Sequence, residues 1–197
     1  MKKAIFWNRP FTLVLFILLL SNFSAFAQKT TVWIVNHAEK DAGKDADLSK
    51  TGQQRAHDLA KTLKHDNVEI IYVTGQKCSA ETADALAQKA RILPRVYTDS
   101  VSKFVDIIKR NFAGKNILIV ADHVTIMQFL MDFGVESPFD SLDENDFDQL
   151  FTITIKDNGN TNLAVQYYGA KNHVTPIPPQ YILDSYYPGY APVLPGN

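Results

Sequence analysis

Side chains that could do chemistry gather in three short polar segments. These segments are residues 36–40 (NHAEK), 74–79 (TGQKCS) and 122–125 (DHVT), and each follows an apolar, β-branched run typical of a buried strand. Histidine can act as a nucleophile or general base, and histidine, cysteine and aspartate can also bind zinc. Ligands of open α/β sheets bind beyond the carboxyl ends of the strands. We therefore expect one pocket that holds His37, Cys78, Asp122 and His123, with Lys40 and Lys77 nearby.

The elements that must position these segments alternate between strand and helix. Apolar runs predict strands at residues 31–36, 68–74, 92–97 and 117–121. Helical spacing and capping residues predict helices that begin after Ser49 and that span residues 78–90, 101–111 and 125–133. Strands at residues 150–156 and 162–168 flank the turn sequence DNGN, which indicates a hairpin. The pattern predicts a three-layer α/β/α fold, with a mostly parallel sheet, helices on both faces and an antiparallel C-terminal hairpin at the edge.

We expect three parts along the chain. Residues 1–27 have the features of a secretory signal peptide: a basic start, a ten-residue apolar run and an Ala-Phe-Ala cleavage site. The apolar run is too short to span a membrane, so we expect cleavage, a secreted or periplasmic protein and no stable membrane anchor. Residues 28–170 form the predicted domain. Residues 171–197 carry six of the nine prolines and form a tail that packs on the domain, stays loose or docks a protein partner.

Composition excludes several classes of protein. Hydrophobic residues make up 46% and charged residues 21% of the 197 residues, which is ordinary globular composition. A formal net charge of −1 argues against a nucleic-acid binder that works through a basic face. The single cysteine, Cys78, excludes an intrachain disulfide and a cysteine-only zinc site.

Four motifs occur in an order and spacing that resemble the histidine phosphatase superfamily, also called phosphoglycerate-mutase-like, and in particular its small exported bacterial members. They are residues 36–40 (NHAEK), 48–56 (LSKTGQQRA), 77–83 (KCSAETA) and 114–126 (GKNILIVADHVTI). The resemblance covers residues 31–169 and implies that fold. It also implies a mechanism in which the first histidine accepts the phosphoryl group. Two arginines and a second histidine then hold the phosphoryl oxygens, and a carboxylate protonates the leaving group.

The chain departs from this pattern at most of the pocket positions. His37 matches the nucleophile, but Asn36 and Cys78 stand at the two arginine positions. A gapless register places Asp122 at the second histidine position, whereas a shift of one residue restores His123. No acid can be assigned by motif. Phosphoryl transfer depends on neutralising the phosphoryl oxygens, which arginine does with a permanently charged planar fork.

Three hypotheses follow from these departures. The first is an exported, degenerate member with weak or no phosphatase activity that binds a small phosphorylated ligand or a partner. The second is an active phosphomonoesterase with a phosphohistidine intermediate at His37, in which Lys40 and Lys77 supply the missing charge. The third is a pocket remade for thiol chemistry or for a metal held by His37, Cys78, Asp122 and His123, although no metal and no cofactor are expected. Asp122 beside His37 should favour the protonated imidazole.

Overall fold

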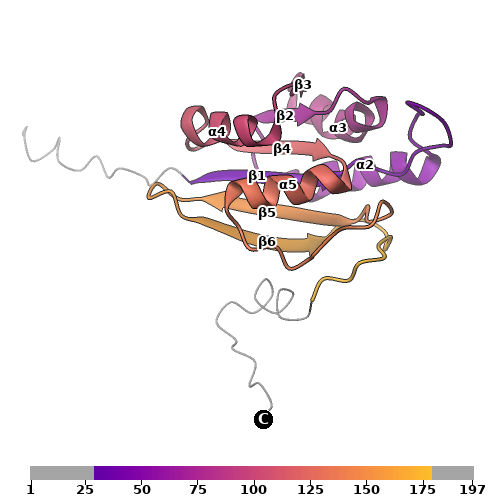
Figure 1. Ribbon diagram of the computed structural model, residues 1–197. Helices are drawn as coiled ribbons and strands as arrows, with labels where there is room; N and C mark the ends of the chain where they lie inside the picture. Colours follow the sequence, from indigo (N-terminus) through magenta and orange to yellow (C-terminus); the bar gives the residue numbers. More distant parts are fainter. Residues whose placement is uncertain (1–28, 179–197) are drawn as a thin grey trace, which may run out of the picture.

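The computed structural model describes residues 29–178, which form a six-stranded sheet with helices on both faces (Figure 1). The strands are β1 (Thr30–Asn36), β2 (Ile70–Val73), β3 (Arg95–Val96), β4 (Asn116–Ala121), β5 (Gln149–Ile155) and β6 (Thr161–Tyr167). Their order is β3-β2-β4-β1-β5-β6. The first four in this order run parallel, whereas β5 pairs antiparallel with β1 and with β6. The predicted fold class is therefore confirmed, including the hairpin at the edge.

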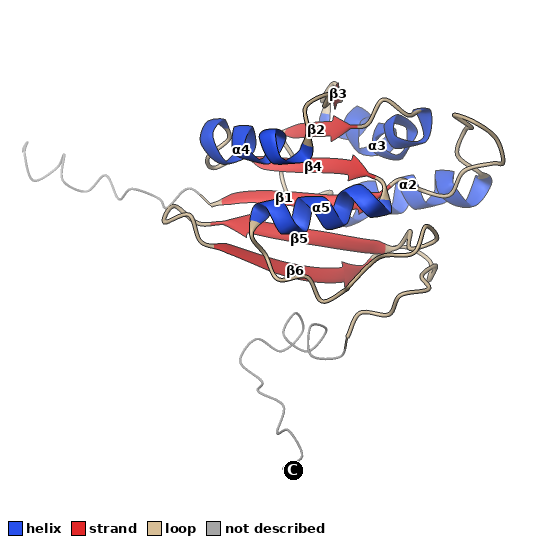
Figure 2. Cartoon of the chain, in the orientation of Figure 1, coloured by secondary structure: helices blue, strands red, loops and turns tan. Residues whose placement is uncertain are grey.

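Helices cover both faces of the parallel part of the sheet, as Figure 2 shows, and two of them pack on each face. On one face, α2 (Lys50–Thr62) and α3 (Lys77–Ala90) pack over apolar side chains such as Trp33 and Val35 of β1. On the other face, α4 (Val101–Asn111) and α5 (His123–Phe133) pack over Val32 and Ile34. Successive strand residues point to opposite faces, so the continuous apolar run of β1 serves both cores.

Local sequence signals explain several element boundaries. The Ser49 hydroxyl accepts a hydrogen bond from the Gly52 amide at 3.1 Å and caps α2. Gly134 adopts a left-handed conformation, with φ of 74°, and ends α5 as predicted. The predicted third strand, residues 92–97, is wrong in extent because only Arg95 and Val96 join the sheet. The Ile92 amide still bonds to the end of α3, and Pro94 has no amide proton for a ladder.

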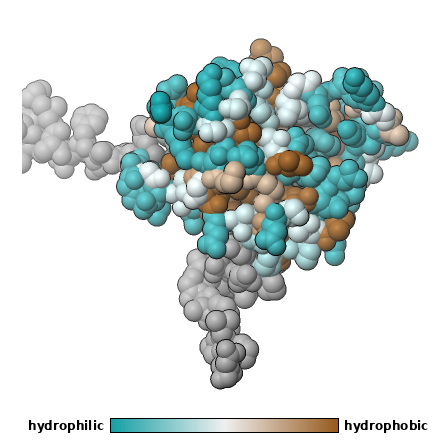
Figure 3. Space-filling model, in the orientation of Figure 1, coloured by the Kyte–Doolittle hydropathy of each residue, from teal (hydrophilic) through white to brown (hydrophobic). Residues whose placement is uncertain are grey.

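The face of the molecule in Figure 3 is mainly hydrophilic, with separate hydrophobic spots. Val124 and Met131 of α5 are among the exposed apolar side chains, at 66% and 64% exposure. Within residues 29–178, no helix is long and apolar enough to cross a membrane. The expected signal peptide and the tail beyond residue 178 lie outside the described residues, so cleavage, export and partner docking remain predictions.

Candidate active site

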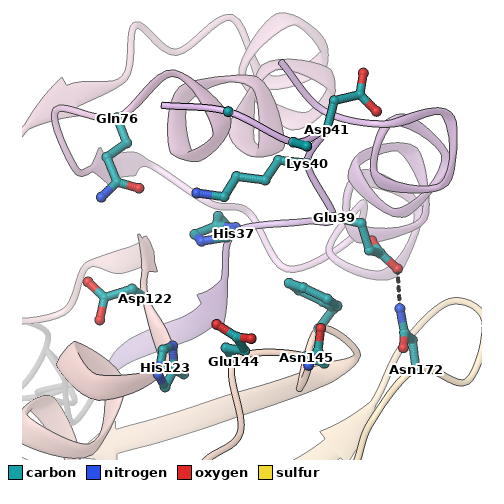
Figure 4. A pocket seen from close by; sticks show the side chains of 13 residues that line it. His37, Glu39, Lys40, Asp41, Gln76, Asp122, His123, Glu144, Asn145 and Asn172 are labelled. Atoms are coloured by element: carbon teal, nitrogen blue, oxygen red, sulfur yellow. Dashed lines mark hydrogen bonds between the residues drawn. The ribbon is translucent and has the colours of Figure 1, made fainter. Parts of the chain in front are cut away.

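A cavity of about 600 Å³ opens where β1 and β4 end (Figure 4). Most of its lining comes from three segments: the loop after β1, the start of α5 and the connection before β5. Gln76, just before α3, and Asn172, after β6, complete it. The lining residues used below are His37, Lys40, Asp41, Asp122, His123 and Glu144. The parallel strands bring their carboxyl ends to one edge of the sheet, so residues distant in sequence meet here as the topology predicts.

His37 is half-buried at the centre of this cavity. Its Nδ1 lies 3.0 Å from the Ala38 carbonyl oxygen. That oxygen can only accept a hydrogen bond, so Nδ1 carries the proton and Nε2 keeps its lone pair. Burial lowers the pKa of His37, and the charges of Lys40 and His123 lower it further. The expectation of a protonated imidazole is therefore wrong: Asp122 does raise the pKa, but its effect is smaller than that of burial.

Asp122 and His123 both line the cavity, at the start of α5. The Asp122 carboxylate accepts hydrogen bonds from the Thr125 amide at 2.9 Å and from the Thr125 hydroxyl at 2.7 Å. Asp122 is thus the N-cap of α5, which explains why this helix begins at His123 rather than at the predicted Thr125. A helix N-terminus favours anions, and here the chain's own carboxylate occupies it.

Two predicted site residues, Asn36 and Cys78, are buried and do not line the cavity. The Asn36 side-chain amide donates to the Asp146 carbonyl at 3.2 Å and, less closely, to that of Glu144 at 3.5 Å. Cys78 packs in a small apolar cluster with Ala38, Leu48 and Ala56, and burial raises the pKa of its thiol. Neither side chain has the exposure or charge that a phosphate clamp or a reactive thiol needs.

The two predicted lysines have different surroundings. Lys40 lines the cavity and lies near His37 (Figure 4). Lys77 does not line it, because its ammonium group pairs with Asp47 and lies 3.9 Å from Glu81. Among the described residues, no group of three or more His, Cys, Asp and Glu side chains is placed to hold a metal ion. The structure thus brings together His37, Lys40, Asp122 and His123, and leaves Asn36, Cys78 and Lys77 outside the cavity.

Glu39 links the cavity to a buried framework behind it. The Glu39 carboxylate receives two hydrogen bonds from the Arg55 guanidinium, at 2.7 and 2.8 Å. Arg55 is 2% exposed and also donates to the carbonyls of Tyr168 and Ala170. Hydrogen bonds from Arg55 and Asn172 outweigh burial and hold the pKa of Glu39 below its usual range. The pair therefore fixes the loop after β1 against α2 and the end of β6.

Gly52 allows this framework to close. A Cβ atom at Gly52 would lie much closer to the Glu39 carbonyl oxygen than van der Waals radii allow. The glycine in residues 48–56 is therefore required by the close approach of α2 to the loop that carries His37.

Sequence reasoning missed the lining residues outside the three polar segments. Glu144, Asn145 and Phe147 come from the connection between α5 and β5, and Asn172 follows β6. The Phe147 and His37 rings lie 6.2 Å apart. The acidic stretch from residue 143 was a visible signal, but neither periodicity nor spacing shows that this connection folds back over the strand ends.

The charge on the cavity lining is mainly negative. Among residues 29–178, Lys40 is the single lysine of the lining, and no arginine lines the cavity. Asp41, Asp122 and Glu144 supply three carboxylates, whereas the charge of Glu39 is balanced by Arg55. Burial lowers the pKa of His37, which reduces the positive charge that this histidine can add.

Comparisons with known proteins agree with this fold. The family model "Histidine phosphatase superfamily (branch 1)" matches residues 30–100. None of the curated proteins matches the chain significantly in sequence.

Solved phosphatase structures resemble the described domain. A mycobacterial glucosyl-3-phosphoglycerate phosphatase has a TM-score of 0.58 and 11% identity, over 73% of this chain and 100% of that one. The Entamoeba histolytica phosphoserine phosphatase with 3-phosphoglyceric acid has a TM-score of 0.54 and 16% identity, over 72% and 98%. The protein histidine phosphatase SixA with tungstate has a TM-score of 0.54 and 18% identity, over 70% and 96%. The chain therefore resembles the histidine phosphatase superfamily in sequence over residues 30–100, and the described domain shares the fold of these solved phosphatases.

Proposed function

We propose that this protein is an exported, degenerate member of the superfamily that turns over phosphate esters weakly or not at all. The observation that carries the proposal is the charge of the cavity: in the described part of the chain, its lining holds three unbalanced carboxylates against one lysine and no arginine. A phosphoryl group brings negative charge that must be neutralised in the transition state. Here the carboxylates of the cavity would instead repel the phosphoryl group.

The size of the deficit follows from the cost of each missing donor. Losing one preorganised donor costs a factor of about 10²–10³ in rate. Asn36 and Cys78 stand where the resemblance implies two guanidinium groups, and both are buried and absent from the cavity lining. Asp122 on the lining adds a negative charge, which repels phosphate. Lys40 supplies a point charge on a flexible stem, which does not replace an aligned guanidinium. Together these changes are sufficient to remove most of an ordinary phosphatase rate.

The second candidate, an active phosphomonoesterase, is favoured by one observation. His37 keeps the properties of a nucleophile: a free Nε2 lone pair, a lowered pKa and a place on the cavity. Attack needs an unprotonated nitrogen, so His37 itself is not the group that disables the site.

A phosphatase assay separates the two candidates. The chain is produced with residues 1–27 in a bacterial host, and the processed protein is tested on p-nitrophenyl phosphate beside His37→Ala. We expect turnover far below about 1 s⁻¹, the lower end of the usual enzyme range, and no difference between the two proteins. Turnover above that rate, abolished by His37→Ala, would establish the second candidate. Mass measurement of the same protein tests export, because retention of residues 1–27 contradicts cleavage.

A further inference from the structure

Two neighbouring segments at the edge of the cavity are joined by buried carboxylates. We call residues 143–149 the wall and residues 172–177 the strap. Asp146 of the wall is 2% exposed. One of its oxygens accepts the Val174 and Thr175 amides of the strap, at 2.8 and 2.9 Å. Its other oxygen accepts the Asp143 amide at 2.8 Å, so one side chain orders both segments.

Asp148 makes a second connection. It is 1% exposed and accepts the Asn172 amide at 2.8 Å. The His173 Nδ1 lies 2.8 Å from the same carboxylate, and the His173 ring stacks on Tyr167 with centroids 4.2 Å apart. The Phe147 amide bonds to the Asn172 carbonyl, and the Gln149 side chain to the Thr175 carbonyl. The wall and the strap therefore share one hydrogen-bond network.

This network also reaches the site. Glu144, Asn145 and Phe147 of the wall and Asn172 of the strap line the cavity. The Asn172 side-chain amide donates to Glu39 at 2.7 Å, and Asn36 donates to the Asp146 carbonyl. A movement of the wall and strap would change the side of the cavity that faces His37.

Few apolar contacts hold the strap. Ile177 is its buried apolar side chain, at 3% exposure, whereas Val174 is 64% exposed. Segments held by polar bonds and little apolar burial open locally without unfolding the core. We propose that the wall and the strap open together as one latch that uncovers the His37 cavity, and that Asp146 is the residue that locks it. This device goes beyond the proposed function and does not depend on whether the site is catalytic.

Asp146→Asn gives the most specific test, because the three groups that donate hydrogen bonds to the Asp146 carboxylate are all backbone amides. An asparagine keeps the shape but turns an NH₂ group toward at least one of these amides, which leaves a buried donor unsatisfied. Asp140→Asn is the matched control, since Asp140 is exposed on the same connection between α5 and β5. His173→Phe is a second variant that keeps a ring against Tyr167 and removes the bond to Asp148.

Amide hydrogen exchange of the processed chain, followed by mass spectrometry, measures how often the wall and the strap open. We expect Asp146→Asn to speed exchange of wall and strap peptides by about tenfold, with β1 and β4 unchanged. Carbethoxylation of His37, measured against exposed His57 of α2, should rise in the same variant. His173→Phe should show both effects more weakly, and Asp140→Asn neither.

Three results would overturn the proposal. They are faster exchange in only one of the two segments, an unchanged ratio of His37 to His57 labelling, and faster exchange throughout the sheet. Should Asp146→Asn fail to fold, His173→Phe decides by the same three criteria.

Discussion

The two sides of the loop after β1 use charged side chains in opposite ways. Behind the loop, Arg55 forms a buried, two-pronged pair with Glu39 and gives its remaining bonds to backbone carbonyls. Toward the cavity, the resemblance implies two arginines, but Asn36 and Cys78 stand at those positions and are buried off the cavity lining, while Asp122 on the lining supplies a negative charge. A buried cation therefore supports the loop that carries His37, whereas the described lining of the cavity has little positive charge. Under the proposed function, this difference separates the positioning of His37 from the binding of a phosphoryl group.

The largest expected effect tests the framework. Arg55→Met removes the charge and leaves the Glu39 carboxylate without its main partner, and breaking a buried pair on one side costs about 3–5 kcal/mol. Chemical denaturation measures the loss in the free energy of unfolding. Arg110→Met is the matched control, because the Arg110–Asp106 pair is exposed and should contribute less than about 1 kcal/mol. Equal effects of the two substitutions would contradict a special role of the buried pair.

The next effect tests the close approach of α2. Gly52→Ala forces a methyl group against the Glu39 carbonyl, and we expect a loss of about 3 kcal/mol in the free energy of unfolding. Gly75→Ala is the control, since nothing lies within 4 Å of a Cβ built there and its φ is not positive. Thermal unfolding of both variants measures the difference. Similar melting temperatures would show that the loop after β1 yields easily and that the framework is softer than we infer.

Sequence patterns predicted the strands and helices of the framework more accurately than they predicted which residues line the cavity. Strand runs and the caps Ser49 and Gly134 are local signals, and the convergence of strand ends follows from topology. The orientation of Lys77 and Cys78 depends on contacts with residues far along the chain: Lys77 turns toward Asp47, and Cys78 packs near Ala38. No local pattern contains such information, so two residues that lie in a promising motif do not reach the cavity.

The third effect concerns the cavity side. Asp122→Asn removes a negative charge while asparagine remains a good N-cap for α5. We expect the affinity for tungstate, an oxyanion resembling phosphate, to rise about tenfold, since a charge near the ligand contributes roughly 1–2 kcal/mol in a partly exposed site. Isothermal titration calorimetry measures it, with Asp99→Asn as the control, since Asp99 does not line the cavity. Unchanged affinity would show that Asp122 is only a cap.

The smallest effect concerns the protonation of His37. The sequence predicted a raised pKa for this histidine, because it shows the neighbouring Asp122 but does not show that His37 is half-buried. The folded-state pKa of His37 lies below its usual 6.5, so the unfolded chain binds more protons as the pH falls through 6.5. The His37 contribution to stability is therefore fully present above pH 6.5 and is lost as the pH falls through the folded-state pKa. NMR titration of the imidazole measures that pKa directly. Asp122→Asn should lower it further, because Asp122 raises it in the wild type, whereas Lys40→Met should raise it. A wild-type pKa above 6.5 would contradict the burial argument and restore the protonated imidazole.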